Sequence, residues 1–292
     1  MSRVFEGAGG NRLVATEMGA GDRSVLLLHG GGQTRHAWAK TARRLAEAGW
    51  RAIAFDQRGH GDSAWVSDGS YAFPDYAADA TAVARRIAAE HGGVKPIAIG
   101  ASLGGIAALL ALGGGGDPMF AGLVLVDIVP RMDAGGVAHI QGFMRTHAAE
   151  GFASVEQAAE AVAVYLPHRP RPQSLDGLKK NLRRHADGRW RWHWDPRFLD
   201  GPHSVNAGWD EARRQLVEAA RQLSVPTLLV RGGASELVTP EAVAEFRALA
   251  PHAEYIDVAE ARHMVAGEHN NVFADAIVGF LGALPRQPLD IA

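Results

Sequence analysis

The sequence predicts an α/β fold with a mostly parallel, doubly wound sheet that is covered by helices on both faces. Short, continuous apolar runs alternate with segments of helical spacing along most of the chain, and such runs are typical of strands buried on both faces of a sheet. The alternation breaks once, over residues 131–205, which indicates an inserted segment. With 292 residues, 47% of them hydrophobic, the chain is long enough to bury a large core.

The first 130 residues supply most of the predicted strands. Two short apolar runs within residues 3–17, with glycines between them, predict a small hairpin at a sheet edge. The following strands and helices alternate, as expected of parallel strands joined by helical crossovers. We predict strands over 24–28, 51–55, 95–100 and 123–127, and helices over 35–48, 75–91 and 106–112.

Residues 131–205 contain no convincing buried strand. We expect them to form a helical cap that is inserted into a core of residues 1–130 and 206–292. The helix-like pieces of the cap lie near 133–149, 154–165 and 173–184. Beyond the cap we predict helices near 209–222, 239–249 and 270–283, with strands over 227–231 and 254–258.

Composition excludes several classes of function. Lys and Arg number 30 against 32 Asp and Glu, a formal net charge of -2, so nothing indicates a nucleic-acid partner or an anionic membrane surface. The lack of cysteine excludes disulfides, a thiolate nucleophile and cysteine-ligated metals. No signal-like stretch opens the chain, and no segment approaches the roughly 20 apolar residues that span a bilayer. We expect a soluble, cytoplasmic protein, whose oligomeric state stays open.

A short pattern, Gly-Ala-Ser-Leu-Gly at residues 100–104, follows an apolar run and precedes a helix-like segment. It predicts a strand, a very tight turn with one serine at its tip, and a helix. Gly100 and Gly104 have no Cβ atom, so strand and helix can pass close together. The oxygen of Ser102 would project above the sheet edge, beside the first free N–H groups of the helix, which suits a nucleophile. Taken alone, the pattern also fits a plain packing turn.

Five pieces of sequence, taken in order, resemble the α/β-hydrolase family, and the resemblance covers nearly everything outside residues 131–205. The pieces are His29-Gly30-Gly31, Asp56-x-Arg58-Gly59-x-Gly61-x-Ser63, the pattern at 100–104, Arg231-Gly232 with an acidic residue soon after, and His263-Met264-Val265. The resemblance implies the α/β-hydrolase fold. It also implies a serine nucleophile with a histidine base, an acid and an oxyanion hole, and no cofactor.

The resemblance assigns Ser102 as the nucleophile and His263 as the base, because the family places that histidine on the loop after the last strand. The family usually places an aspartate after the strand that follows the cap, where this chain has Glu236. We expect Glu236 to orient His263. Asp127, at the end of the preceding strand, is the alternative, because some members carry the acid there. His269 is a competing base, although it more simply begins the last helix.

An oxyanion hole needs two or more fixed N–H donors. The family takes one from the residue after the nucleophile and one from the loop after the third strand. This implies Leu103 and Gly31, with Gly32 able to take the second role. The histidines show no His-Glu-x-x-His pattern, so we expect no metal site.

Other polar and aromatic residues stand out with less specific meaning. Asp56, Arg58 and Asp62 are expected to fix a loop through ion pairs and turns rather than to act in catalysis. Three alternating tryptophans lie on one face if their segment is extended. They either hold the cap onto the core, which is the commoner role, or line a substrate pocket; they are Trp190, Trp192 and Trp194.

These residues predict a cofactor-independent serine hydrolase that cleaves a small, apolar carboxylic ester or lactone. Serine at the tip argues against epoxide hydrolases and haloalkane dehalogenases, which use an aspartate there because their intermediate is an alkyl ester. Carbon–carbon bond hydrolysis and perhydrolysis use the same three residue types, so both stay open. The alternative outside the enzymes is a non-catalytic binding protein that holds a small ligand under the cap.

Overall fold

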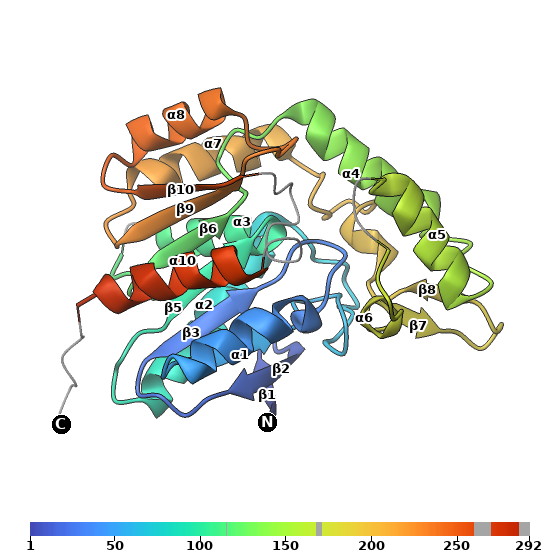
Figure 1. Cartoon of the computed structure of the whole chain (residues 1–292), viewed down its shortest axis with the longest axis horizontal. Helices are drawn as coiled ribbons and strands as arrows, with labels where there is room; N and C mark the ends of the chain where they lie inside the picture. The colour runs from blue at the N-terminus through green and yellow to red at the C-terminus, as the bar shows by residue number, and fades with distance from the viewer. Residues whose placement is uncertain (115, 168–170, 260–269, 286–292) are drawn as a thin grey trace.

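An eight-stranded sheet runs through the part of the protein that the computed structural model describes, residues 1–114, 116–167, 171–259 and 270–285 (Figure 1). Its strand order is β1-β2-β4-β3-β5-β6-β9-β10. Strands β4 to β10 of this order pair in parallel, whereas β1 and β2 form an antiparallel hairpin at one edge, as predicted. The strands are β1 (Ser2–Glu6), β2 (Arg12–Met18), β3 (Ser24–Leu28), β4 (Arg51–Phe55), β5 (Ile97–Ala101), β6 (Leu123–Val126), β9 (Thr227–Gly232) and β10 (Glu254–Val258).

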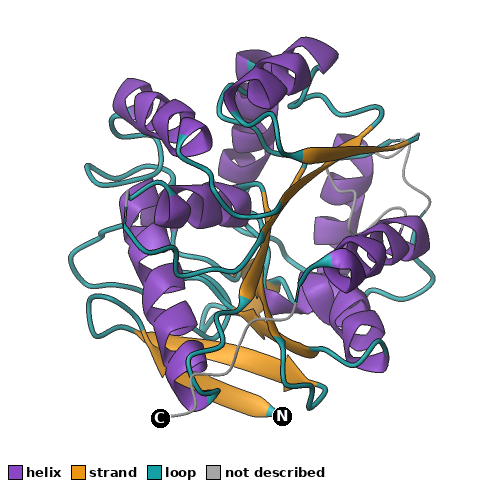
Figure 2. Cartoon of the chain, turned by 90° about the vertical axis from the view of Figure 1, so that its left-hand side faces the viewer, coloured by secondary structure: helices purple, strands orange, loops and turns teal. Residues whose placement is uncertain are grey.

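Helices cover both faces of the sheet (Figure 2). The short 3-10 helix η1 (Arg35–Trp38), α1 (Ala39–Glu47) and α10 (Asn270–Ala283) pack on one face. The other face is covered by α2 (Phe73–Glu90), α3 (Leu103–Leu112), α7 (Trp209–Arg221) and α8 (Pro240–Leu249). The sheet is therefore doubly wound, as the alternation of strands and helices predicts.

The central strands are apolar throughout because both of their faces are buried. In β3, Leu26 and Leu28 belong to the core under α2 and α3. Val25 and Leu27, which point the other way, belong to the core under α1 and α10. Successive side chains of a strand alternate between faces, so a continuous apolar run is what two cores require.

Between β6 and α7 the chain leaves the sheet and forms a segment beside it, at the right of Figure 1. This inserted segment contains α4 (Ala134–Thr146), α5 (Val155–Tyr165), the short α6 (Asp176–Lys179), β7 (Leu182–Arg184), β8 (Trp190–Trp192) and the 3-10 helix η2 (Pro196–Phe198). The first two predicted cap helices match α4 and α5. The cap boundaries at residues 131 and 205 stay a prediction.

The inserted segment contains helices, as predicted, but also two short strands that were not predicted: β7 and β8 pair as an antiparallel hairpin. The expected helix near 173–184 is reduced to α6, and its end is a strand. The turn that closes the hairpin contains Asp187-Gly188, with Gly188 at φ +80°. Asp-Gly pairs favour such turns because glycine adopts positive φ without strain. This dipeptide was the signal for the hairpin.

Within the described ranges, no helix has the length and apolar character that crossing a membrane requires.

We expect Gly104→Ala to lower the free energy of unfolding by about 3 kcal/mol, as overpacking does. A Cβ atom on Gly104 would lie 2.5 Å from the backbone carbon of Leu28 and 2.6 Å from its Cβ. Urea unfolding measures the effect. The matched control is Gly279→Ala in α10, where a Cβ meets no atom within 4 Å and alanine should stabilise the helix by up to about 1 kcal/mol. Equal stability of the two variants would contradict this close approach.

Candidate active site

Ser102 lies at the tip of the turn between β5 and α3, in a backbone conformation that few residues adopt. Its φ is 46° and its ψ is -117°. Non-glycine residues with positive φ are uncommon and often mark functional sites. The serine is the N-cap residue of α3, yet its side chain makes no capping hydrogen bond. The residue is half-buried at the edge of the sheet.

The loop after β3 lies directly beside this turn. A Cβ atom on Gly30 would lie 3.4 Å from the Cβ of Ser102, and one on Gly31 would lie 4.0 Å from that of Leu103. The N–H groups of Gly31 and Leu103 donate to no acceptor among the residues that the structure describes. The N–H of Gly32, in contrast, donates to a side chain of another loop, at 3.1 Å. This geometry favours Gly31 over Gly32 as the loop's donor.

Asp127 follows β6 and lies next to Ser102 along the edge of the sheet. Strands β5 and β6 are paired so that Ala101 lies opposite Val126, which leaves Ser102 and Asp127 one residue further along neighbouring strands. Asp127 is fully buried and, like Ser102, has a positive φ, 50°. Its carboxylate accepts hydrogen bonds from the N–H of Gly232 at 3.0 Å and the hydroxyl of Ser235 at 2.6 Å.

Glu236 lies on the loop after β9, with an exposed side chain. Its backbone packs against the N-terminal turn of α4, at Gly136. Its charge acts on Tyr165 of α5: burial, and then the charge of Glu236, raise the pKa of that phenol to about 12. The carboxylate thus lies toward the inserted segment, whereas Asp127 lies within the sheet edge.

His263 and His269, the two expected bases, lie outside the described residues. Strand β10 is parallel to β9, so Val258 ends at the same edge of the sheet as Ser102. Within the described part of the chain, no group of three or more His, Asp or Glu side chains is arranged to hold a metal ion.

The three tryptophans of the inserted segment have different surroundings. The indole Nε1 of Trp194 would lie 3.7 Å from a Cβ on Gly32. Trp192 is buried against Phe143 and Phe152, with ring centroids 5.9 and 5.1 Å away. Trp190 is half-buried at the end of the hairpin. Of the three, Trp194 lies against the loop beside Ser102; whether any of them lines a substrate pocket stays a prediction.

Two residues near the same loop were missed by the sequence analysis. The Cε atom of Met144 would lie 2.7 Å from a Cβ on Gly32, and the ring of Phe198 would lie 3.3 Å from one on Gly31. Together with Trp194 they form an apolar roof over the loop. Only Phe198 had a local signal, the Asp195-Pro196 pair that starts a helical turn.

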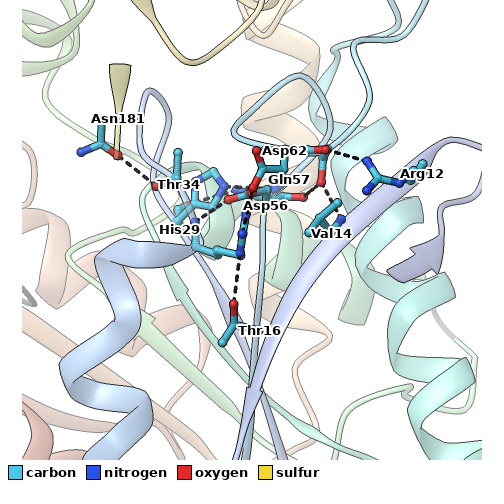
Figure 3. A network of polar contacts seen from close by, with 11 residues as sticks. Arg12, Val14, Thr16, His29, Thr34, Asp56, Gln57, Asp62 and Asn181 are labelled. Carbon is cyan, nitrogen blue, oxygen red and sulfur yellow. Dashed lines mark hydrogen bonds and ion pairs between the residues drawn. The ribbon is translucent and has the colours of Figure 1, made fainter. Parts of the chain in front are cut away.

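The loop after β4 is fixed by the expected ion pairs and lies in the network of Figure 3. Asp56 accepts a hydrogen bond from the N–H of Arg35 at 2.6 Å and pairs with its guanidinium group. It also accepts from the N–H of Asp62 at 2.9 Å. Arg58 binds Asp79 of α2 with two hydrogen bonds, of 2.8 and 2.7 Å. These residues are structural.

Two buried histidines, His29 and His60, lie between this loop and the loop beside Ser102, with ring centroids 5.2 Å apart. Each ring faces a backbone carbonyl at Nδ1 and a backbone N–H at Nε2, so each is neutral with its proton on Nδ1. Burial lowers the pKa of His29 to about 4 and that of His60 to about 3. The Nδ1–H of His29 donates to the carbonyl of Gly30 at 2.8 Å, and its Nε2 accepts from the N–H of Gln57 at 3.0 Å. The Nδ1–H of His60 donates to the carbonyl of Arg58 at 2.9 Å, and its Nε2 accepts from the N–H of Gly32 at 3.1 Å.

We expect the free energy of unfolding to fall as the pH is lowered from about 7 to 5. In the unfolded chain these histidines bind a proton near pH 6.5, whereas their pKa values in the folded protein are about 4 and 3. The unfolded state therefore binds more protons over this range, which destabilises the fold. Urea unfolding at several pH values measures the slope. His60→Gln should reduce the slope, and His203→Gln, at an exposed position, should leave it unchanged; a flat profile for the unaltered protein would contradict the assignment.

Comparison with known proteins agrees with this fold. A family model described as "Serine aminopeptidase, S33" matches residues 19–270. The chain is 31% identical over 287 residues to Esterase Rv0045c of Mycobacterium tuberculosis, covering 96% of this chain and 89% of that protein. It is 26% identical to a 3-hydroxybutyrate-oligomer hydrolase of Cupriavidus necator, over 88% of each. The crystal structure of E-2-(acetamidomethylene)succinate hydrolase superposes with a TM-score of 0.83 and 25% identity, covering 97% of this chain and 99% of that one. The predicted α/β-hydrolase fold is confirmed.

Proposed function

Because this chain belongs to the serine aminopeptidase S33 family of α/β-hydrolases and is an esterase-like hydrolase, we propose that it cleaves a carboxylic ester or lactone through an acyl-enzyme on Ser102. The strained backbone of Ser102, with φ 46° and ψ -117°, is the observation that carries the proposal. Such strain persists only where the surrounding structure enforces it, and it often serves function. Here it places the hydroxyl of Ser102, which makes no capping hydrogen bond to α3, at the edge of the sheet.

In the proposed reaction, Ser102 Oγ attacks the substrate carbonyl carbon while His263 takes the hydroxyl proton. The oxyanion of the tetrahedral intermediate accepts hydrogen bonds from the N–H groups of Gly31 and Leu103. His263 then gives its proton to the leaving alkoxide, so that an acyl-serine and an alcohol result. A water molecule then attacks the carbonyl carbon of the acyl-serine while His263 takes its proton. Collapse of this second tetrahedral intermediate releases the acid, and His263 returns the proton to Ser102.

We propose Asp127, rather than Glu236, as the acid that orients His263. Asp127 is buried beside the end of the strand that carries Ser102, and hydrogen bonds from Gly232 and Ser235 hold its carboxylate in place. Glu236 has an exposed side chain and lies toward Tyr165 in the inserted segment. A buried, fixed carboxylate suits an acid that must hold an imidazole in one orientation.

The surroundings of Ser102 support an apolar group next to the scissile carbonyl. The roof over the loop beside Ser102 consists of Met144, Trp194 and Phe198, and such walls favour apolar substrate groups. We therefore propose that residues 131–205 act as a cap over the site. The similarity to an esterase supports an ester as the substrate class.

Ser102→Ala should lower ester turnover by about 10⁴-fold or more, because the nucleophile is lost. The measurement is hydrolysis of a panel of p-nitrophenyl esters of increasing acyl length, lactones and a diketone, together with fluorophosphonate labelling followed by peptide mass analysis. The control is Ser67→Ala, at an exposed site, which should label and turn over like the unaltered protein. Undiminished turnover by Ser102→Ala would refute the acyl-enzyme. Ligand-induced thermal stabilisation without product, in both the unaltered protein and Ser102→Ala, would indicate a binding protein instead.

Asp127→Asn and Glu236→Gln separate the two candidate acids. We expect Asp127→Asn to lower kcat by about 10³-fold or more, because an amide cannot stabilise the imidazolium cation. Its oxygen can still accept the N–H of Gly232, so the fold should persist, and urea unfolding checks this. Glu236→Gln should change kcat by less than about 3-fold, as for a side chain outside the triad. The opposite order of effects would assign the acid to Glu236.

A further inference from the structure

His60 makes contact with the loop beside Ser102 from outside the expected catalytic set. It is fully buried after β4. Its Nε2 atom accepts the N–H of Gly32 at 3.1 Å, and its Nδ1–H donates to the carbonyl of Arg58 at 2.9 Å. Both atoms of the ring that can hydrogen-bond are therefore engaged with backbone groups of two different loops.

Gly31 is the proposed oxyanion donor, and as a glycine it has no side chain to hold its backbone in place. The peptide before it is held because the carbonyl of Gly30 accepts from His29 Nδ1 at 2.8 Å and from the N–H of Gln33 at 3.2 Å. A peptide unit is planar, so these bonds, both made to its carbonyl oxygen, restrict the direction of the Gly31 N–H but do not fix it alone. The peptide after Gly31 is held by the hydrogen bond from Gly32 to His60.

We propose that His60 is a positioning residue for the oxyanion hole, which holds the peptide between Gly31 and Gly32 so that the Gly31 N–H stays directed toward the substrate oxygen at Ser102. This inference rests on the proposed function of Ser102. The role is distinct from that of His29, which acts on the peptide before Gly31. With both peptides held, the two backbone dihedrals of Gly31 are restricted as well.

The same residue connects the oxyanion hole to the inserted segment. The ring of His60 packs edge-on against that of Phe198, with centroids 4.9 Å apart. Its backbone neighbours pair with the segment: the N–H of Gly61 donates to the carbonyl of His193 at 2.8 Å, and the N–H of Asp195 donates to that of Gly59 at 2.8 Å. The position of His60 is thus set from the core and from the inserted segment together.

Two substitutions separate the contacts of the ring. His60→Asn places an amide where Nδ1 lies, so it can keep the bond to Arg58 but loses the acceptor for Gly32. His60→Gln places an oxygen near the position of Nε2, so it can keep the acceptor for Gly32. We expect His60→Asn to lower kcat for a p-nitrophenyl ester by about 10- to 100-fold, approaching the loss of an oxyanion donor, with KM changed by less than about 3-fold. His60→Gln should retain most of the kcat.

A second readout distinguishes positioning from general loosening of the fold. Phenylboronic acid forms a tetrahedral adduct with an active serine, so its inhibition constant should rise in His60→Asn in parallel with the fall in kcat/KM. The control for loosening is Ser63→Ala in the same loop, which removes hydrogen bonds to Val14 and Asp56. It should lower the free energy of unfolding without changing kcat. All variants are assayed where circular dichroism shows them to be folded.

Wild-type kcat and boronate affinity in His60→Asn, or equal losses in His60→Asn and His60→Gln, would overturn the inference. Failure of the proposed function has a different signature. In that case fluorophosphonate does not label Ser102 in the unaltered protein, or Ser102→Ala still turns over ester. If His60→Asn does not fold, His60→Gln decides alone: a retained kcat with unchanged boronate affinity is the expected result, and a loss of both together in a folded variant overturns it.

Discussion

The hydrogen bonding of the mostly buried loop of residues 56–62 connects the loop beside Ser102 to two helices and to the inserted segment. Apart from the exposed side chain of Asp62, its polar groups lie away from water, where an unpaired polar group is costly. Asp56 accepts the N–H of Arg35 in η1, and Arg58 binds Asp79 of α2. His60 forms a hydrogen bond with the loop beside Ser102, and the backbone around His60 pairs with the inserted segment. The hydrogen bonds of this one loop thereby hold two helices, the loop beside Ser102 and the inserted segment relative to one another.

Much of the fold was predictable because its signals are local. Continuous apolar runs such as β3 reflect burial on both faces, and the pattern at 100–104 contains within five residues the glycines that a close strand–helix crossing needs. The hairpin of β7 and β8 was not predicted because its strands are three residues each, too short to show a period. Its turn was visible in the sequence, but the helical spacing around it suggested another structure.

The candidate site, whose residue roles stay predictions, could be derived from the sequence only as far as its residues lie on regular elements. Ser102, Gly31 and Leu103 follow from the strand and turn that carry them. The choice between Asp127 and Glu236 depends on the register of β5 and β6 and on hydrogen bonds across more than a hundred residues of sequence. No pattern in a single sequence encodes such contacts. His60 was missed for the same reason, since its partner Gly32 lies in another loop.

The backbone of Ser102 has a consequence for how this protein evolves. A non-glycine residue at positive φ carries about 1–3 kcal/mol of strain, whereas glycine adopts the same conformation with little penalty. In the proposed function, the serine is therefore a position at which selection for turnover opposes selection for stability. In a descendant that had lost the activity, only the stability of the fold would be under selection at this position. Glycine at position 102 would then mark a lineage that kept the fold as a binding scaffold.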